Sequence, residues 1–324
     1  MGPNDFICQL YSTFGGTLPD ITTNIAGIKL ENPTMLASGI MDEDSGSIKR
    51  IIDCGAGAIV TKSIGLSARK GYPNPTVIEL EHGLLNAMGL PNSGIDRYAE
   101  EIISFKNSKI PIIGSIYGSN SQEFIKLGKK MENYGVSALE LNLSCPHAKS
   151  YGLQLGCDSS IVQKITTSVK KNVGIPVYVK LSPNVTDIVK IAKAAENGKA
   201  DAIVAINTIK AMKIDIELGK PILSNIIGGY SGGAIKPIGV RCVYELSTNL
   251  NIPIIGVGGI TNGVDALEYL MAGASAVQIG SGVYYRGPEV FKKVCDEIKN
   301  WMKAHKFNKL TEIIGAAHKW IFLK

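Results

Sequence analysis

The chain of 324 residues is poor in aromatic residues, which make up 6% of it, and contains four histidines. Its 34 lysines and arginines are scattered, so the net charge of +6 forms no basic stripe and few aromatic residues lie beside it. Nucleic-acid binding normally needs such a stripe, or side chains on which bases stack. The sequence therefore predicts no nucleic-acid partner, and an acidic small-molecule ligand better explains local positive charge.

Long apolar runs and paired cysteines are also absent. No apolar stretch approaches the roughly 20 residues of a membrane-spanning helix, and the N-terminus lacks the features of a secretory signal. The cysteines are dispersed and include no C-x-x-C pair: Cys8, Cys54, Cys145, Cys157, Cys242 and Cys295. This pattern is typical of free thiols rather than of disulfides, zinc sites or iron–sulfur sites. We therefore expect a cytoplasmic protein that neither binds a metal nor contacts a membrane.

Short β-branched apolar runs alternate with amphipathic segments along the chain, which is typical of α/β proteins. Eight runs are predicted strands: 34–38, 58–62, 110–116, 138–143, 176–181, 202–206, 253–257 and 276–279. Eight segments with apolar residues at helical spacing are predicted helices: 45–54, 94–107, 121–134, 159–172, 185–197, 236–250, 263–272 and 288–304. Eight such units predict a single (β/α)8 TIM barrel over 21–324, after an N-terminal extension of residues 1–20.

Two connections, 64–93 and 208–235, are too long for simple turns. In a barrel, such insertions lie at the C-terminal ends of the strands, where the active site is built. The segment Leu141-Asn142-Leu143-Ser144-Cys145-Pro146-His147 directly follows a predicted strand and combines amides, a hydroxyl and a thiol. Most intracellular cysteines are inert, but Cys145 gains little from packing in a polar loop and can reach the thiolate form. It is the first candidate for catalysis.

Glycine-rich turns follow the last two predicted strands, with Gly258 and Gly259 in one turn and Gly280 beside Ser281 in the other. A third turn of this kind contains Gly232. Backbone N–H groups after the seventh and eighth strands of a barrel can bind a phosphate group. A single glycine turn would be better explained as a tight turn, but two in register favour a phosphate site.

Two lysines, Lys62 and Lys180, close strand-like runs and would lie at the barrel mouth. Each is a candidate cation beside a flavin or carboxylate, or a Schiff-base nucleophile, although a lysine at a rim can also be a solvated side chain. Amides and a hydroxyl follow other predicted strands or lie in the first insertion, at Asn86, Asn207 and Thr208. Lone asparagines usually cap turns, but several at a barrel mouth suit a pyrimidine ring.

Motifs in a consistent order resemble class 1 dihydroorotate dehydrogenase. They are Ala37-Ser38-Gly39, Thr61-Lys62-Ser63, Asn86-Ala87-Met88-Gly89-Leu90, Asn142-Leu143-Ser144-Cys145-Pro146, Lys180, Asn207-Thr208 and the glycine turns. The likeness runs from about residue 21 to the C-terminus. It implies a TIM barrel that binds one FMN per chain and oxidises (S)-dihydroorotate to orotate in de novo pyrimidine (UMP) biosynthesis.

The resemblance also implies residue roles. Cys145 matches the catalytic base, which takes the C5 proton while a hydride leaves C6 for FMN, and Lys62 stabilises negative charge on the reduced ring. The implied flavin contacts are Ser38, Lys62, Ser63, Asn142, Lys180, Ile206 and Gly232, with the phosphate at Gly258, Gly259, Gly280 and Ser281. The implied substrate contacts are Lys62, Asn86, Ala87, Met88, Gly89, Leu90, Asn142, Asn207 and Thr208.

The segments 207–216 and 231–237 resemble the NAD-linked subclass, called 1B. Its catalytic subunits pair with a second subunit that carries FAD and a [2Fe–2S] cluster, which agrees with the lack of cluster-type cysteines here. The stretch Met88-Gly89-Leu90-Pro91-Asn92 is also similar to the fumarate-linked subclass, so fumarate stays an alternative acceptor. We also expect a homodimer.

Two positions depart from the family pattern. His147 stands where members usually carry a substrate-binding asparagine, and Ser115 stands where NAD-linked members often have an asparagine near FMN. Cys-Pro-His also resembles dihydropyrimidine dehydrogenases, which reduce uracil and thymine on the same fold. The loop Asn86–Leu90 favours orotate, because its backbone donors suit a carboxylate. A Schiff-base aldolase that uses Lys62 or Lys180, and a barrel subunit without catalysis, are the alternatives from other classes.

Overall fold

The computed structural model describes residues 18–143 and 153–323, and its centre is a closed barrel of parallel strands. In chain order the barrel strands are β3 (Thr34–Leu36), β4 (Ala58–Val60), β7 (Ile112–Ile116), β8 (Ala138–Asn142), β9 (Val177–Leu181), β10 (Ala202–Ala205), β15 (Ile254–Val257) and β16 (Ala274–Ile279). Each strand pairs with its neighbours in chain order, and β16 closes on β3. The predicted TIM barrel is confirmed, and every predicted strand is a barrel strand.

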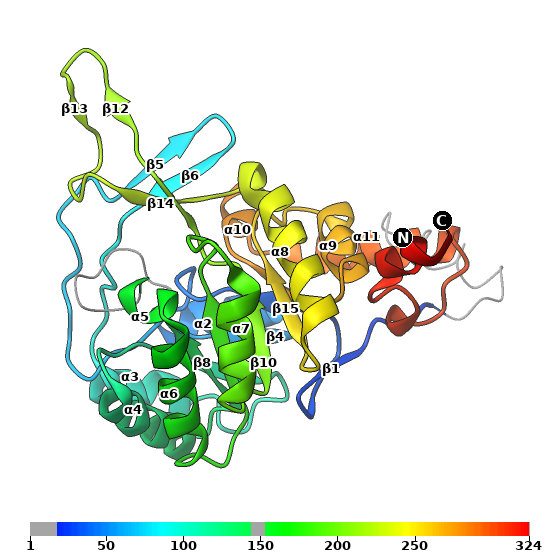
Figure 1. Ribbon diagram of the computed structural model, residues 1–324, viewed down its shortest axis with the longest axis horizontal. Coiled ribbons are helices and arrows are strands. Elements are labelled where there is room, and N and C mark those ends of the chain that lie inside the picture. The colour runs from blue at the N-terminus through cyan, green and yellow to red at the C-terminus, as the bar shows by residue number, and fades with distance from the viewer. Residues whose placement is uncertain (1–17, 144–152, 324) are drawn as a thin grey trace, which may run out of the picture.

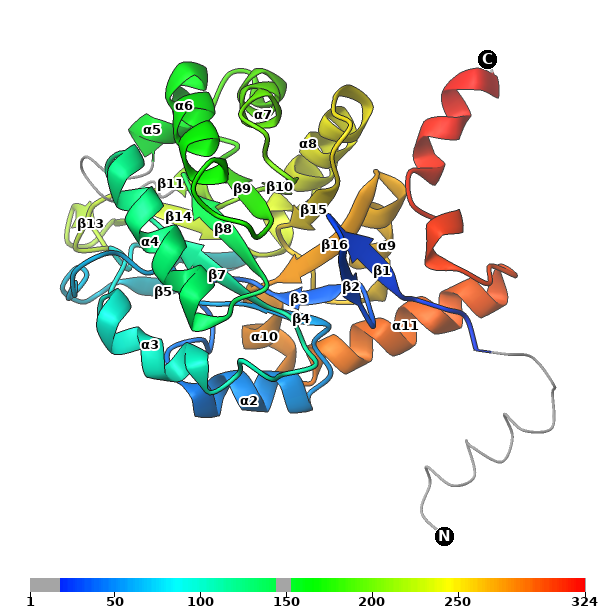
Figure 2. The ribbon, with the colours of Figure 1, turned by 90° about the horizontal axis from the view of Figure 1, so that it is seen from below.

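Helices surround the barrel and lie within the segments predicted for them (Figures 1 and 2). They are α2 (Ser45–Asp53), α3 (Ile95–Ile103), α4 (Ser121–Tyr134), α6 (Ser159–Lys170), α7 (Ile188–Asn197), α8 (Lys236–Asn249), α9 (Gly263–Met271) and α11 (Val290–Ala304). Several begin at side-chain caps, including Asp187 before α7 and Asn262 before α9, where Asp265 completes a capping box. Two short helices, α5 (Leu153–Cys157) and α10 (Ser281–Arg286), were not predicted because so few residues show no helical period.

The barrel strands separate two hydrophobic cores by the alternation of their side chains. On β9, Val177 and Val179 belong to the core between strands and helices, whereas Tyr178 belongs to the core inside the barrel. The hairpin of β1 (Thr23–Ile25) and β2 (Ile28–Leu30) closes the N-terminal end of the barrel, where the Tyr178 hydroxyl donates to the Ile25 carbonyl at 3.2 Å. The C-terminal ends of the barrel strands lie at the opposite end, which is the mouth of the barrel (Figure 2).

The two long connections pair with each other above that mouth. They supply β5 (Val77–Leu80), β6 (Gly83–Asn86), β11 (Ile209–Ala211) and β14 (Gly228–Ser231), which form an antiparallel sheet in the order β11-β14-β6-β5. The hairpin of β12 (Ile214–Asp215) and β13 (Lys220–Pro221) extends away from the body (Figure 1). The sequence predicted the insertions but not their strands, since the register Gly229↔Asn86 joins distant residues.

The remaining described elements are the 3-10 helices η1 (Gly233–Ile235), η2 (Leu310–Glu312) and η3 (Ala316–Leu323). Within 18–143 and 153–323, the helices are all too short or too polar to cross a membrane. The boundary between residues 1–20 and the barrel stays a prediction, because residues 1–17 lie outside the described part.

Candidate active site

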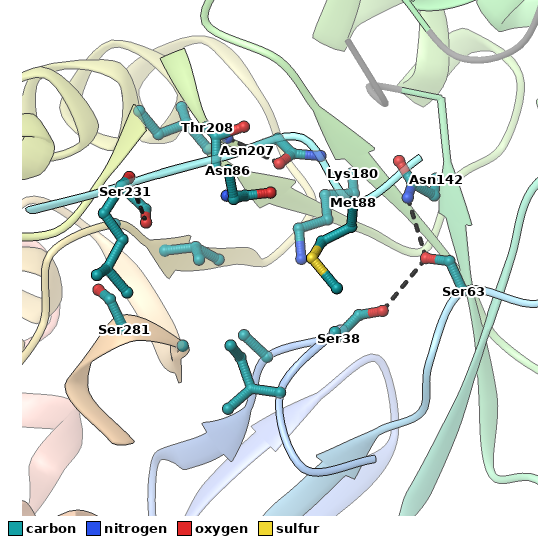
Figure 3. A pocket seen from close by; sticks show the side chains of 18 of the residues that line it. Ser38, Ser63, Asn86, Met88, Asn142, Lys180, Asn207, Thr208, Ser231 and Ser281 are labelled. Carbon is teal, nitrogen blue, oxygen red and sulfur yellow. Dashed lines mark hydrogen bonds between the residues drawn. The ribbon is translucent and has the colours of Figure 1, made fainter. Parts of the chain in front are cut away.

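A cavity of about 370 Å³ lies at the mouth of the barrel, beneath the sheet formed by the insertions (Figure 3). Its lining comes from the C-terminal ends of the barrel strands and from both long connections. Most predicted site residues line it: Ser38, Lys62, Ser63, Asn86, Met88, Gly89, Leu90, Asn142, Lys180, Ile206, Asn207, Thr208, Gly258, Gly259, Gly280 and Ser281. The fold thus gathers positions from 38 to 281 into one space of the size that small ligands occupy.

Three predicted site residues are not in this lining. Ala87 is buried beside the cavity, and its N–H donates to the Thr76 carbonyl at 2.7 Å. Gly232 lies behind the turn after β15, where its carbonyl is 2.5 Å from the position that a Cβ on Gly259 would take. Cys145 lies outside the described residues, as do Ser144 and His147. The roles of these residues stay predictions.

Ser63 is the centre of a hydrogen-bond network along one side of the cavity. Its Oγ lies 2.8 Å from Ser115 Oγ and 3.2 Å from Ser38 Oγ, and it accepts from Asn142 Nδ2 at 3.0 Å (Figure 3). These side chains follow or belong to β3, β4, β7 and β8, which are consecutive in the barrel. Ser115, noted in the sequence as a departure, therefore supports the lining residue Ser63 from below.

Lys62 is held by a carboxylate on the loop between β3 and α2. Its Nζ lies 2.5 Å from Glu43 Oε1; the Lys62 side chain is 14% exposed and the Glu43 side chain 70% exposed. The neighbouring Asp42 is buried and accepts from the Gly39 N–H at 2.5 Å, while its Oδ1 has no hydrogen-bond partner among the described residues. Burial raises the pKa of Asp42 to about 6, although the Gly39 N–H and the charge of Lys62 oppose the rise.

Lys180 reaches the cavity from inside the barrel, where it is paired with a buried carboxylate. Its Nζ lies 3.3 Å from Glu140 Oε1 and 3.0 Å from Gln278 Oε1. Gln278 Nε2 in turn donates to Glu140 Oε2 at 2.6 Å. Both lysines therefore form ion pairs, Lys180 with Glu140 and Lys62 with Glu43, whereas a nucleophilic lysine is activated by an apolar pocket or a neighbouring cation. The Schiff-base aldolase alternative therefore finds no support in this geometry.

The loop that begins at Asn86 is held from behind. Asn86 Nδ2 donates to the Gly229 carbonyl at 3.2 Å, which joins the two insertions. Arg69 Nε donates to the Gly89 carbonyl at 2.6 Å, and Asn92 Nδ2 donates to the Leu90 carbonyl at 2.9 Å. These contacts fix the backbone of the loop, and Asn86, Asn207 and Thr208 lie near one another at the edge of the cavity (Figure 3). This arrangement can present amide groups to a flat polar ring.

The glycine turns lie at another end of the cavity. Gly258 and Gly259 have φ of +131° and +69°, values that side chains rarely adopt, and the turn also packs against Gly232 too closely for a Cβ at Gly259. Tyr269 fixes the turn, because its hydroxyl donates to the Gly258 carbonyl at 2.8 Å. Ser281 begins α10 directly after β16. The backbone of these glycine turns lines the same cavity as several hydroxyls and two lysines. This combination fits a phosphate-bearing cofactor.

Sequence reasoning missed six residues that support the site: Asp42, Glu43, Arg69, Glu140, Tyr269 and Gln278. None touches the cavity as a lining residue. The signal for Glu140 and Gln278 was present, since both are polar residues within apolar strand runs. Their partners could be identified only in three dimensions.

Within the described residues, no group of three or more histidine, cysteine, aspartate or glutamate side chains is arranged to hold a metal ion.

Comparison with known proteins identifies the family. The dihydroorotate dehydrogenase profile matches residues 20–302. The chain is 54% identical over 303 residues to "Dihydroorotate dehydrogenase B (NAD(+)), catalytic subunit" of Methanocaldococcus jannaschii, covering 92% of this chain and 98% of that protein. Proteins of the same name from Thermoplasma volcanium and Pyrococcus furiosus are 53% and 50% identical, over 93% and 92% of this chain and 100% and 99% of their own lengths.

These similarities cover nearly the whole barrel and all the cavity residues named above. They confirm the resemblance to the catalytic subunit of the NAD-linked subclass that the motifs predicted. The chain belongs to the dihydroorotate dehydrogenase family of oxidoreductases.

Proposed function

We propose that this chain is the catalytic subunit of an FMN-dependent enzyme that oxidises (S)-dihydroorotate to orotate in de novo pyrimidine biosynthesis. The observation that carries the proposal is the single cavity at the barrel mouth, which joins two cations, a set of amides and two glycine turns. The names of the relatives support the same activity.

We assign the FMN phosphate to Gly258, Gly259, Gly280 and Ser281, and the isoalloxazine ring to the side of the cavity formed by Ser38, Ser63, Asn142, Lys180 and Ile206. Gly232 supports this site through its packing on Gly259. When bound, FMN supplies a two-electron acceptor for the hydride that leaves C6 of the substrate.

The chain's own residues carry the remaining chemistry. Asn86 to Leu90, Asn142, Asn207 and Thr208 bind and orient the substrate, and the thiolate of Cys145 takes the proton from C5. The ammonium groups of Lys62 and Lys180 stabilise negative charge that develops in the cavity, where the surrounding protein strengthens electrostatic interactions. Since residues of both insertions line the cavity, substrate binding there also excludes water from the reacting atoms.

We further propose that electrons pass to NAD through a partner subunit carrying FAD and a [2Fe–2S] cluster, and that the catalytic chain forms a homodimer. The relatives are named as catalytic subunits of NAD-linked enzymes, a term used for one component of a larger enzyme. The purified chain alone should then reduce neither NAD nor fumarate at a useful rate. Rapid fumarate reduction by the chain alone would transfer the assignment to the fumarate-linked subclass.

The activity is tested by an anaerobic visible spectrum of the purified protein before and after adding dihydroorotate and, separately, dihydrouracil. We expect a yellow protein that is bleached by dihydroorotate alone. Bleaching by dihydrouracil would favour the dihydropyrimidine dehydrogenase alternative. A protein that folds but takes up no FMN would contradict the proposal.

The assigned base is tested by Cys145→Ala. We expect this variant to keep FMN but to slow flavin reduction by dihydroorotate by about 10²–10⁴-fold, the usual effect of a general base. Cys157→Ala is the matched control, because Cys157 is an exposed cysteine close in sequence, and its substitution should leave the rate unchanged. Near-normal reduction by Cys145→Ala at neutral pH, measured by stopped-flow absorbance, would refute the assignment.

A further inference from the structure

We propose that Glu140 and Gln278 are positioning residues that maintain Lys180 as a cation aimed at the flavin, and thereby help to set the reduction potential of bound FMN. The inference rests on the proposed function, because it takes the cavity to be the FMN site. Neither residue lines the cavity, so both would act through Lys180.

The alternation of the strands places all three side chains inside the barrel. Leu139 and Leu141 flank Glu140 and face the helices, and Val277 and Ile279 do the same around Gln278. Lys180 lies on the same side of β9 as Tyr178, which belongs to the interior core. The three polar side chains therefore form one layer of the barrel interior, directly below the cavity that Lys180 lines.

The strands that carry these residues span the barrel. β8 and β9 are neighbours, whereas β16 lies four strands from β8 in either direction around the closed sheet. Gln278 thus reaches across the interior to join Glu140, to which it donates at 2.6 Å, and Lys180, from which it accepts at 3.0 Å. The Lys180–Glu140 contact of 3.3 Å completes a triangle of hydrogen bonds.

The two contacts of Lys180 in this triangle account for only part of its hydrogen-bonding capacity. An ammonium group has three hydrogens, and within the described residues Glu140 and Gln278 use two of them. Because Lys180 lines the cavity, the third can be donated to a ligand there. The Lys180 side chain is 7% exposed and that of Glu140 is 0% exposed, so water does not compete for the pair.

A purely structural role explains this layer poorly. A buried ion pair contributes little to stability compared with apolar residues of the same volume, because both charges must be desolvated. Other interior positions of the barrel are filled by Met35, Val60, Ile113, Val204 and similar residues, which pack without that cost. A charged layer that occurs where the barrel meets the cavity indicates instead a role in binding or tuning the ligand.

The consequence concerns charge at the cavity. A cation beside the flavin favours the reduced, more negative ring over the oxidised ring. With the Glu140 carboxylate replaced by a neutral amide, Lys180 would be an uncompensated buried cation, which the protein avoids by releasing the proton or withdrawing the side chain. Either response removes positive charge from the cavity. We therefore expect Glu140→Gln to lower the FMN reduction potential.

The experiment measures the midpoint potential of FMN bound to the holoprotein by anaerobic titration, and the FMN dissociation constant by fluorescence. For Glu140→Gln we expect the preference for reduced over oxidised FMN to fall about tenfold, which is about 30 mV for a two-electron couple. Gln278→Leu keeps the ion pair but removes its bridge, and should shift the potential in the same direction by less. Lys180→Met should abolish any further effect of Glu140→Gln in the double variant.

Asp201→Asn is the matched control. Asp201 forms a partly buried ion pair with Lys170 at 2.7 Å, but it directly precedes β10, at the end of the barrel away from the cavity. This variant removes a partly buried, ion-paired carboxylate outside the cavity and should leave the potential unchanged.

A higher FMN midpoint potential in Glu140→Gln would overturn the proposal. It would mean that Glu140 acts on the flavin directly through its negative charge and not through Lys180. An unchanged potential would show that the residue serves packing alone. If Glu140→Gln does not fold, Gln278→Leu decides by the same criteria. A wild-type protein that binds FMN but is not reduced by dihydroorotate would refute the proposed substrate and leave this test intact.

Discussion

The two lysines that line the cavity differ in how exposed their carboxylate partners are. Lys62 is paired with Glu43, a largely exposed side chain on the loop between β3 and α2. Lys180 is paired with Glu140, a fully buried side chain on a barrel strand. An exposed pair is weakened by water and salt and can exchange partners, whereas a buried pair is fixed by its neighbours. The barrel therefore fixes one cation, and a loop holds the other in a replaceable contact.

This difference bears on ligand binding. A carboxylate-bearing substrate or the flavin can take the place of Glu43 at Lys62, because Glu43 can return to water at little cost. Glu140 cannot leave Lys180 in that way. Lys62 is therefore suited to exchange its carboxylate partner when a ligand binds. Lys180 is suited to provide a constant positive electrostatic potential in the cavity.

The largest expected effect that separates the two lysines is on folding stability. Lys180→Met leaves the Glu140 carboxylate buried without a counter-charge, so we expect the free energy of unfolding to fall by about 3–5 kcal/mol. Lys62→Met removes a pair whose carboxylate is largely exposed and should cost about 0–1 kcal/mol. Urea unfolding of the FMN-free proteins at pH 7 measures both.

The double variant Lys180→Met with Glu140→Gln is the control for that comparison. It removes both charges and should recover most of the lost stability. Equal effects of Lys180→Met and Lys62→Met would show that the two environments do not differ as the structure indicates.

A second prediction concerns Asp42, the buried carboxyl beside Lys62. Because its pKa rises from the usual 3.8 to about 6 on folding, the folded state binds the extra proton between these values. Stability from this group is complete below about pH 3.8 and is lost as the pH rises through about 6. At 1.36 kcal/mol per pH unit, the loss is about 3 kcal/mol.

Asp42→Asn should remove this pH dependence. We expect the difference in unfolding free energy between variant and wild type to change by up to about 3 kcal/mol between pH 4 and pH 7, with the variant relatively more stable at pH 7. Urea titrations at several pH values measure it. Asp44→Asn, at the exposed cap of α2, is the comparison variant; an identical pH profile for wild type and Asp42→Asn would contradict the assignment.

The smallest expected effect is that of Glu43→Gln. The variant removes the counter-charge of Lys62 at a position that is largely exposed, so the free energy of unfolding should change by less than about 1 kcal/mol. The same measurement at high salt should show an even smaller difference, because salt screens an exposed pair. A loss of several kcal/mol would mean that Glu43 is as firmly bound as Glu140.

The sequence predicted the fold well because the barrel depends on local patterns. Each strand is a short apolar run whose alternate residues pack on either side, and each surrounding helix has an apolar face of its own. Lys62 and Lys180 could be predicted at the mouth because a residue at the C-terminal end of a parallel strand has only one end of the barrel to occupy. Chain position alone was sufficient for these residues.

The supporting contacts could not be predicted in the same way. Glu140 and Gln278 are separated by 138 positions, and Asn86 and Gly229 by 143, so no local pattern relates the members of either pair. Ser115 was noted only as a departure from a family pattern, whereas the structure shows its hydroxyl 2.8 Å from Ser63 Oγ.

Periodicity and strand ends, which are local features of the sequence, were therefore enough to predict the barrel, its mouth and the lysines, amides and glycine turns there. Ser38, Ser63 and Ile206 were implied by the resemblance to the family. Tertiary structure alone decided which groups hold those residues. Closing the barrel brings strands four positions apart in the sheet to within hydrogen-bonding reach, and pairing the two insertions closes the cavity from above. Charges and amides that are distant in the chain become partners only when that closure removes water between them.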